Sequence, residues 1–335
     1  MKKYIVFLLI CLFLGSCSGS KKSRQADLKG IDFDVTIERF DKDFWALKES
    51  KNQKEDLQKL FQKYSEFAPI YFDKIVNFGD NIDTILLVLP KFFADTAVNH
   101  LYSDVLKKFI NISAIEKNVT MAFRRGHYFF PKLPVPKCIM HVSGLNQSIV
   151  VGDYFIAIST DNYLGENYNL YNQLGIYNYV AQNMKSEKIA PDYIFAWLSV
   201  EFPYMVEKQR LLDEMIYRGK ILYLMSILMP DEKGEILMGY TKKQWQWCKD
   251  NEKNMWQTLI TEKHLFGSEH SLVLKYLDDA PFTQPFTQES PGRAGQFIGW
   301  QIVKSYMIKN QNVTPLQLMQ NTNAQQILEK SGYNP

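Results

Sequence analysis

The chain has 335 residues, of which 46% are hydrophobic and 14% aromatic, and its formal net charge at pH 7 is only +3. This composition excludes an intrinsically disordered protein and is sufficient for a globular domain with a substantial core. No basic run is longer than three residues, so there is no clustered positive surface of the kind that binds nucleic acid.

The N-terminus has the layout of a bacterial lipoprotein signal. Lys2 and Lys3 are basic, residues 4–14 are apolar, and small residues precede Cys17. The apolar run is shorter than the ~20 residues that a membrane-spanning helix needs. We therefore predict a signal peptide over residues 1–16 and acylation of Cys17, with acyl chains such as palmitate holding the protein on a membrane. A cleaved signal with a chance cysteine, or an uncleaved helix, are the alternatives.

Residues 17–30 are small, polar and basic without apolar periodicity, which predicts a flexible, lipid-anchored tether. Lys21, Lys22 and Arg24 either lie against anionic headgroups or belong to a solvated linker. Residues 31–335 are expected to form a single domain.

Helical spacing dominates the first third of this domain, after a half-buried strand predicted over residues 31–37 from its alternating pattern. Helices are expected over Phe40–Leu47 and Leu57–Phe67, with Pro69 ending the second. Further helices are expected at about 91–109 and 113–130.

The middle of the chain changes period. Apolar, β-branched runs at Val135–Val142 and Ile149–Ile158 flank a turn-rich spacer and predict paired strands. After Pro191 the pattern is helical again, with Thr241 and Thr314 at N-cap positions; the expected helices are 192–205, 210–228, 241–264, 269–278, 292–310 and 314–331. The predicted fold class is α+β, predominantly helical, with a small β-sheet packed on helices.

Two cysteines remain in the mature chain besides the lipidation site, since Cys11 leaves with the signal. A disulfide between Cys138 and Cys248 is possible in an oxidising envelope. Because Cys138 lies in a strand-like run and Cys248 in a helix-like one, two independent buried thiols are favoured.

A small sheet followed by two helices is also the arrangement of zincin peptidases, which carry His-Glu-x-x-His on one helix. The corresponding place here is Val200-Glu201-Phe202-Pro203-Tyr204, in which Val200 and Tyr204 stand at the two histidine positions. Arg218, on the following helix, occupies the third-ligand place as a cation. We therefore predict no metal, no cofactor and no catalytic residues at this place.

Glu201 and Arg218 would face each other if these two helices pack side by side. The hypothesis is that this pair stabilises the degenerate site in place of a metal. The alternative is that Arg218 bonds to Glu214, one helical turn earlier.

Glycines recur at the start of the helix expected at 292–310. Gly292, Gly295 and Gly299 share one flank, which favours close helix packing over a ligand surface. Arg293 has no helix-dipole reason to stand near the helix start, so it should have a partner carboxylate such as Glu289.

Several strings resemble the gliding-motility lipoprotein GldB family of Bacteroidota, from about residue 31 to the C-terminus: Trp197–Pro203, Met215–Tyr223, Gly239–Thr241, Asn251–Trp256, Asp279–Thr283 and Glu289–Met307. The resemblance implies an envelope lipoprotein associated with the gliding and protein-secretion apparatus. It also implies a zincin-like fold, distantly related to predicted zinc proteases, and supplies no catalytic residues.

The expected function is non-catalytic binding of other envelope, gliding or secretion proteins, with the membrane contacted through the lipid at Cys17. No acidic run follows Cys17, which in this phylum favours the periplasmic side of the outer membrane. One alternative is a hydrolase with an unrecognised site near Glu201. Another is a periplasmic carrier of a peptide or glycan, in a cleft expected to involve Tyr163, Tyr204, Trp300 and Arg293.

Overall fold

The computed structural model describes residues 25–205 and 209–335. The predicted signal peptide, Cys17 and most of the predicted tether lie outside the described residues.

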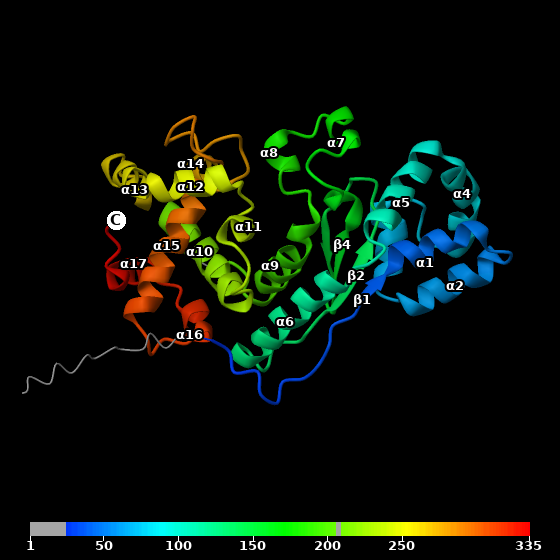
Figure 1. Ribbon diagram of the computed structural model, residues 1–335, viewed down its shortest axis with the longest axis horizontal. Helices are drawn as coiled ribbons and strands as arrows, with labels where there is room; N and C mark the ends of the chain where they lie inside the picture. The colour runs from blue at the N-terminus through cyan, green and yellow to red at the C-terminus, as the bar shows by residue number, and fades with distance from the viewer. Residues whose placement is uncertain (1–24, 206–208) are drawn as a thin grey trace, which may run out of the picture.

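A four-stranded mixed sheet lies at the centre of the molecule (Figure 1). Its strands are β1 (Ile37–Arg39), β2 (Lys137–His141), β3 (Ile149–Val151) and β4 (Phe155–Ser159), in the order β1-β2-β4-β3. β1, β2 and β4 run parallel, whereas β3 is an antiparallel edge strand paired with β4. β4 is buried along its whole length, as expected for a parallel strand covered on both faces.

The helices of the first third gather mainly on one side of the sheet in Figure 1. They are α1 (Phe40–Ala46), α2 (Gln53–Lys63), α3 (Phe67–Ile70), α4 (Ile82–Ala94), α5 (Thr96–Lys108) and α6 (Ser113–Phe129), with a π-helical turn at Tyr71–Ile75. Aromatic side chains fill the space beneath them, and the Phe40 ring contacts five others: Phe44, Tyr64, Phe67, Tyr71 and Phe72. α6 leaves this group and packs against α9 and α10.

The rest of the chain builds the other side of the molecule. Its helices are α7 (Asn169–Gln173), α8 (Asn178–Ala181), α9 (Ile189–Glu201), α10 (Leu211–Leu228), α11 (Gly234–Met238), α12 (Lys242–Asp250), α13 (Glu252–Thr261), α14 (His270–Leu277), α15 (Ala294–Lys309), α16 (Pro315–Gln320) and α17 (Ala324–Ser331). α9 packs on β4, and α10 packs on α9 and α15.

α10 and α15 cross with their backbones in direct contact. A Cβ atom placed on Gly299 would lie 2.0 Å from the carbonyl oxygen of Met215, and one on Gly219 would lie 2.4 Å from the carbonyl carbon of Gly299. The close packing predicted for the glycine series is therefore confirmed at Gly299. Gly292 precedes the helix and lies against Ala280 instead.

Several predicted boundaries were wrong for identifiable local reasons. Pro69 does not end a helix but lies in the first turn of α3, where a proline is tolerated. The helix predicted at 91–109 is divided at Asp95, whose carboxylate accepts from the amides of Ala97 and Val98 and so begins α5. The strand predicted over 31–37 begins only at Ile37, and the Val35 amide donates instead to the Thr120 hydroxyl.

Three predicted helices of the C-terminal part also have different boundaries in the structure. The segment predicted at 241–264 is interrupted at Asn251 and the one at 314–331 at residues 321–323. The helix expected from residue 292 begins at Ala294, because Arg293 adopts a left-handed conformation with φ 60°. The N-caps predicted at Thr241 and Thr314 are confirmed, each as a reciprocal capping box.

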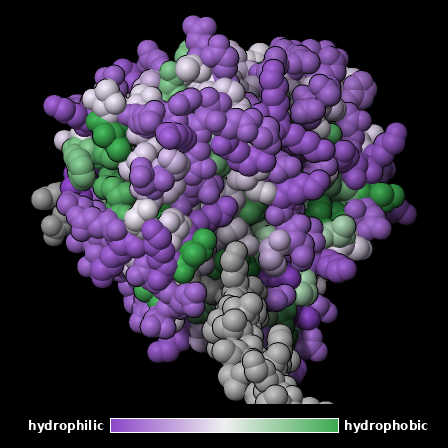
Figure 2. All heavy atoms as spheres, turned by 60° about the vertical axis from the view of Figure 1, so that its left-hand side comes forward, coloured by the Kyte–Doolittle hydropathy of each residue, from purple (hydrophilic) through white to green (hydrophobic). Residues whose placement is uncertain are grey.

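The mostly helical α+β class is confirmed, while the zincin-like arrangement and the single domain stay predictions. Cys138 and Cys248 are both buried and free, as favoured, and burial raises the pKa of each thiol. Within residues 25–205 and 209–335, no helix is both long and apolar enough to cross a bilayer. Figure 2 shows a largely polar face on which apolar residues form separate small groups.

Candidate functional site

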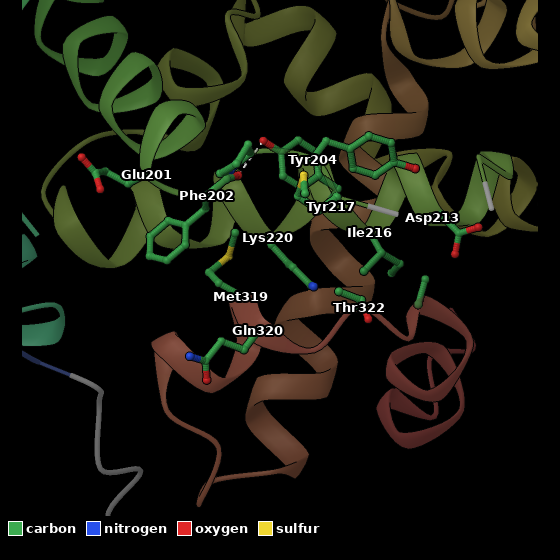
Figure 3. A pocket seen from close by; sticks show the side chains of 13 residues that line it. Glu201, Phe202, Tyr204, Asp213, Ile216, Tyr217, Lys220, Met319, Gln320 and Thr322 are labelled. Atoms are coloured by element: carbon green, nitrogen blue, oxygen red, sulfur yellow. Dashed lines mark hydrogen bonds between the residues drawn. The ribbon is translucent and has the colours of Figure 1, made fainter. Parts of the chain in front are cut away.

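A pocket of about 220 Å³ opens where the end of α9, one face of α10 and the α16–α17 connection meet (Figure 3). Residues 201–205 form one wall, and Met319, Gln320, Thr322 and Ala324 form another. Asp213, Ile216, Tyr217 and Lys220 line it from α10. The pocket contains Glu201 and Tyr204, two of the side chains that the sequence analysis singled out.

Backbone geometry at the end of α9 shapes this pocket. The helix ends at Glu201, and the chain turns away through Phe202 and Pro203. The Tyr217 hydroxyl donates to the Phe202 carbonyl at 2.9 Å, the bond dashed in Figure 3. The Tyr204 ring lies against the Tyr217 ring, with centroids 4.9 Å apart. α10 therefore holds the segment after α9 in place.

Lys220 is the cation of the pocket. Lys220 is only 5% exposed, and its ammonium donates a hydrogen bond to the Asn321 carbonyl at 2.5 Å. Among the described residues it has no carboxylate within ion-pairing distance. Burial lowers the pKa of the Lys220 ammonium to about 8, because a charge removed from water is disfavoured.

The structure does not form the predicted pair between Glu201 and Arg218. Arg218 contacts Asp278 at 3.2 Å, the Leu277 carbonyl at 3.0 Å and Glu214 at 3.8 Å. The Glu214 contact is the alternative that the sequence analysis kept open. Arg218 therefore joins α10 to the end of α14 rather than to α9.

Glu201 is half-buried at the rim of the pocket, and burial raises the pKa of its carboxyl. In Figure 3 the carboxylate points away from the Lys220 nitrogen. No hydrogen bond or ion pair holds it among the described residues.

The positions compared with zinc ligands are not arranged as a metal centre. The Val200 residue is 50% exposed, whereas the Tyr204 hydroxyl is buried without a hydrogen-bond partner in the described part of the chain. Within the described ranges, the structure brings together no group of three or more His, Cys, Asp or Glu side chains suited to a metal ion.

The cleft expected around Tyr163, Tyr204 and Trp300 is not formed, since Tyr204 alone of the three lines this pocket. The Tyr163 hydroxyl donates to Asp192 at 2.9 Å beside α9. Trp300 is 1% exposed inside α15, with the Lys304 ammonium 4.2 Å from its ring centroid. Tyr163 and Trp300 are therefore core residues, whereas Tyr204 lines the pocket.

Arg293 pairs with a carboxylate, as predicted, but the carboxylate belongs to a different residue from the one suggested. Its guanidinium contacts Asp279 at 3.0 Å rather than the suggested Glu289, and it lies over the Tyr240 ring. Because Gly292 packs directly on Ala280, the Arg293 side chain emerges beside the 278–280 segment.

Lys220 is the functional candidate that sequence reasoning missed. The available signal was a lysine directly before the apolar run Ile221–Met225, on a helix whose residues are all buried or half-buried. Local periodicity did not distinguish it from a solvent-facing lysine, because α10 is apolar almost all round.

Comparisons with known proteins give one match. A family model described as "Gliding motility protein GldB" matches residues 21–335. No curated protein and no solved structure matches the chain. Since the family model covers most of the sequence, including the pocket and both sides of the sheet, the chain belongs to the GldB family of gliding motility proteins.

Proposed function

We propose that this protein is a lipid-anchored component of the bacterial cell envelope that serves gliding and protein secretion by binding other envelope components, without catalysis. The observation that carries the proposal is the family match over residues 21–335. In this proposal the acyl chains on Cys17, the residue that follows the predicted signal peptide, supply the membrane anchor, with the periplasmic side of the outer membrane as the proposed location.

The pocket supports binding better than catalysis. General acid–base chemistry needs a titratable group held within hydrogen-bonding reach of the reacting atoms. Among the described residues nothing orients the Glu201 carboxylate, and it points away from Lys220 in Figure 3. A hydrolase is the second candidate, because the raised pKa of Glu201 is a property that general acids share.

Complementation separates the two functions. In a gliding bacterium that lacks its own family member, a Glu201→Gln chain should restore colony spreading, because binding does not need that carboxylate. Loss of spreading by a Glu201→Gln protein that is folded and normally abundant would instead favour the hydrolase.

The anchor is tested in the same strain. Cys17→Ser should abolish incorporation of labelled fatty acid and fail to restore spreading, while Cys11→Ser, within the apolar part of the signal, should behave as wild type. Protease added to intact cells should leave the wild-type protein uncut if it faces the periplasm. Fatty-acid labelling of the Cys17→Ser chain would refute the anchor, and digestion in intact cells would refute the location.

A further inference from the structure

We infer that the pocket between α9, α10 and the α16–α17 connection binds a carboxylate group attached to an apolar moiety, such as the free C-terminus of a peptide, through the Lys220 ammonium. This inference rests on the proposed binding function and names the ligand class for it.

Lys220 differs from the buried Lys188 and from the half-buried Lys304. Lys188 is 7% exposed and pairs with Asp192 at 3.0 Å, and Lys304 lies over an aromatic ring. Lys220 is as buried as Lys188, but among the described residues its ammonium contacts a single neutral carbonyl, that of Asn321. An ammonium has three donor hydrogens, so two remain for a ligand.

The walls around Lys220 define the rest of the ligand. Phe202, Ile216, Tyr217 and Met319 line the pocket with apolar surface. Gln320 and Thr322 are exposed, neutral and polar. A volume of about 220 Å³ is below the roughly 300–1,000 Å³ of pockets for whole drug-sized ligands, so it suits one end of a longer ligand.

Charge in the pocket favours a monoanion. Asp213 is already paired with Arg210 at 2.7 Å. The Glu201 carboxylate lies away from Lys220 in Figure 3. The lining has two acidic residues and one cation, and within the described ranges that cation has no carboxylate partner, so a carboxylate fits this site better than a dianionic phosphate.

A bound carboxylate should change the protonation of Lys220. The other ionisable groups of the lining are Glu201 from α9, Tyr204 from the following segment, and Asp213 and Tyr217 from α10, whereas the 319–324 segment contributes none. Because burial lowers the pKa of Lys220 to about 8 and an adjacent anion raises it, binding near pH 8.5 should take up protons.

The test is calorimetric titration of the full-length protein in a non-ionic detergent with N-acetyl-L-phenylalanine and with its neutral amide. The acid should bind at least about tenfold more tightly than the amide, as expected for a charge-assisted hydrogen bond. Titrations at pH 8.5 in buffers of different ionisation enthalpy should show that the protein takes up about half a proton or more per site when it binds the acid. Inorganic phosphate should not compete.

Two variants assign the effect to Lys220. Lys220→Gln keeps a neutral donor toward Asn321 and should remove the preference for the acid together with the proton uptake. Lys304→Gln, at a half-buried lysine that lines no described pocket, should change neither. Equal binding of acid and amide by the unmodified protein would overturn the inference even if Lys220→Gln fails to fold. Such a result would leave the anchored binding function intact, since spreading and fatty-acid labelling test that independently.

Discussion

His141 is an unusual residue of the sheet, because its imidazole is fully buried and neither ring nitrogen has a hydrogen-bond partner in the described structure. The rings of Phe67 and Tyr71 lie 5.2 and 5.8 Å from it, centroid to centroid. Burial lowers the pKa of His141 to about 3, since the charged form cannot be solvated there.

The depressed pKa of His141 predicts a loss of stability in acid. Between about pH 6.5, the unfolded value, and pH 3 the unfolded chain binds a proton that the folded protein excludes, so stability falls as the pH falls. From pH 7 to pH 5 this histidine should cost about 2 kcal/mol of unfolding free energy. Urea denaturation of a His141→Leu variant should show a pH dependence weaker by that amount.

Buried carboxyl groups do not affect the difference in pH dependence between the His141→Leu variant and the wild type. Burial raises the pKa of Asp41 and Asp161, but both residues are present in each protein and cancel in the difference. Leu87→Ala, at an exposed position without an ionisable side chain, should leave the pH dependence unchanged. Parallel stability curves for His141→Leu and wild type would contradict the prediction.

The contacts of Arg218 lead to a second prediction at this scale. Arg218→Met should lower the free energy of unfolding by about 1–2 kcal/mol, because it removes the bonds to Asp278 and the Leu277 carbonyl. The guanidinium is partly exposed, which limits the loss. Glu201→Gln should stay within about 0.5 kcal/mol of wild type. A double-mutant cycle should give coupling between Arg218 and Asp278 but none between Arg218 and Glu201; the reverse result would restore the pair predicted from the sequence.

Two helix N-caps could be predicted from neighbouring residues in the sequence, whereas two helix breaks could not. Thr241 and Thr314 were identifiable as N-caps because cap and partner glutamine lie three residues apart in sequence. The breaks at Asp95 and Asn251 were missed, since apolar spacing continues through them and both helices of each pair bury a face against the same core.

The crossing of α10 and α15 is the element contact most sensitive to substitution. Gly299→Ala should lower the free energy of unfolding by about 2 kcal/mol or more, because the added Cβ would lie 2.0 Å from the Met215 carbonyl oxygen and force the helices apart. This exceeds the ~1 kcal/mol that alanine gains in helix propensity. Thermal or urea unfolding provides the measurement.

A control on the same helix is Ile308→Ala, where the side chain is 69% exposed, with a change expected within about 0.5 kcal/mol. A Gly299→Ala protein as stable as wild type would mean that α15 can shift without cost.

Across the whole molecule, one hydrophobic cluster runs from Val35 to Ile327 and joins the helices on both sides of the sheet. Cys138 lies in β2 and Cys248 in α12. The reactivity of the two thiols therefore reports on the unfolding of two different parts of this cluster. If residues 31–335 fold as a single domain, both thiols should become reactive at the same urea concentration.

Pulsed thiol labelling followed by peptide mapping measures this directly. In native buffer both thiols should be protected, and a reducing agent should not change stability, since neither cysteine forms a disulfide. Two separate labelling midpoints would show that the sheet and the C-terminal helices unfold independently, and would contradict the single-domain prediction.

Sequence alone was enough to predict the mostly helical α+β class, the two free thiols and the family, because each depends on local composition, periodicity or long contiguous strings. The lipoprotein signal, read from the same local patterns, stays a prediction. The partner of Arg218, the separation of Tyr163, Tyr204 and Trp300, and the placement of Lys220 in a pocket could be learned only from the folded structure. This is because a side chain's charge partner and burial depend on which helices meet. In this protein that meeting is controlled by the close approach of α10 and α15 at two glycines 80 positions apart in sequence, Gly219 and Gly299.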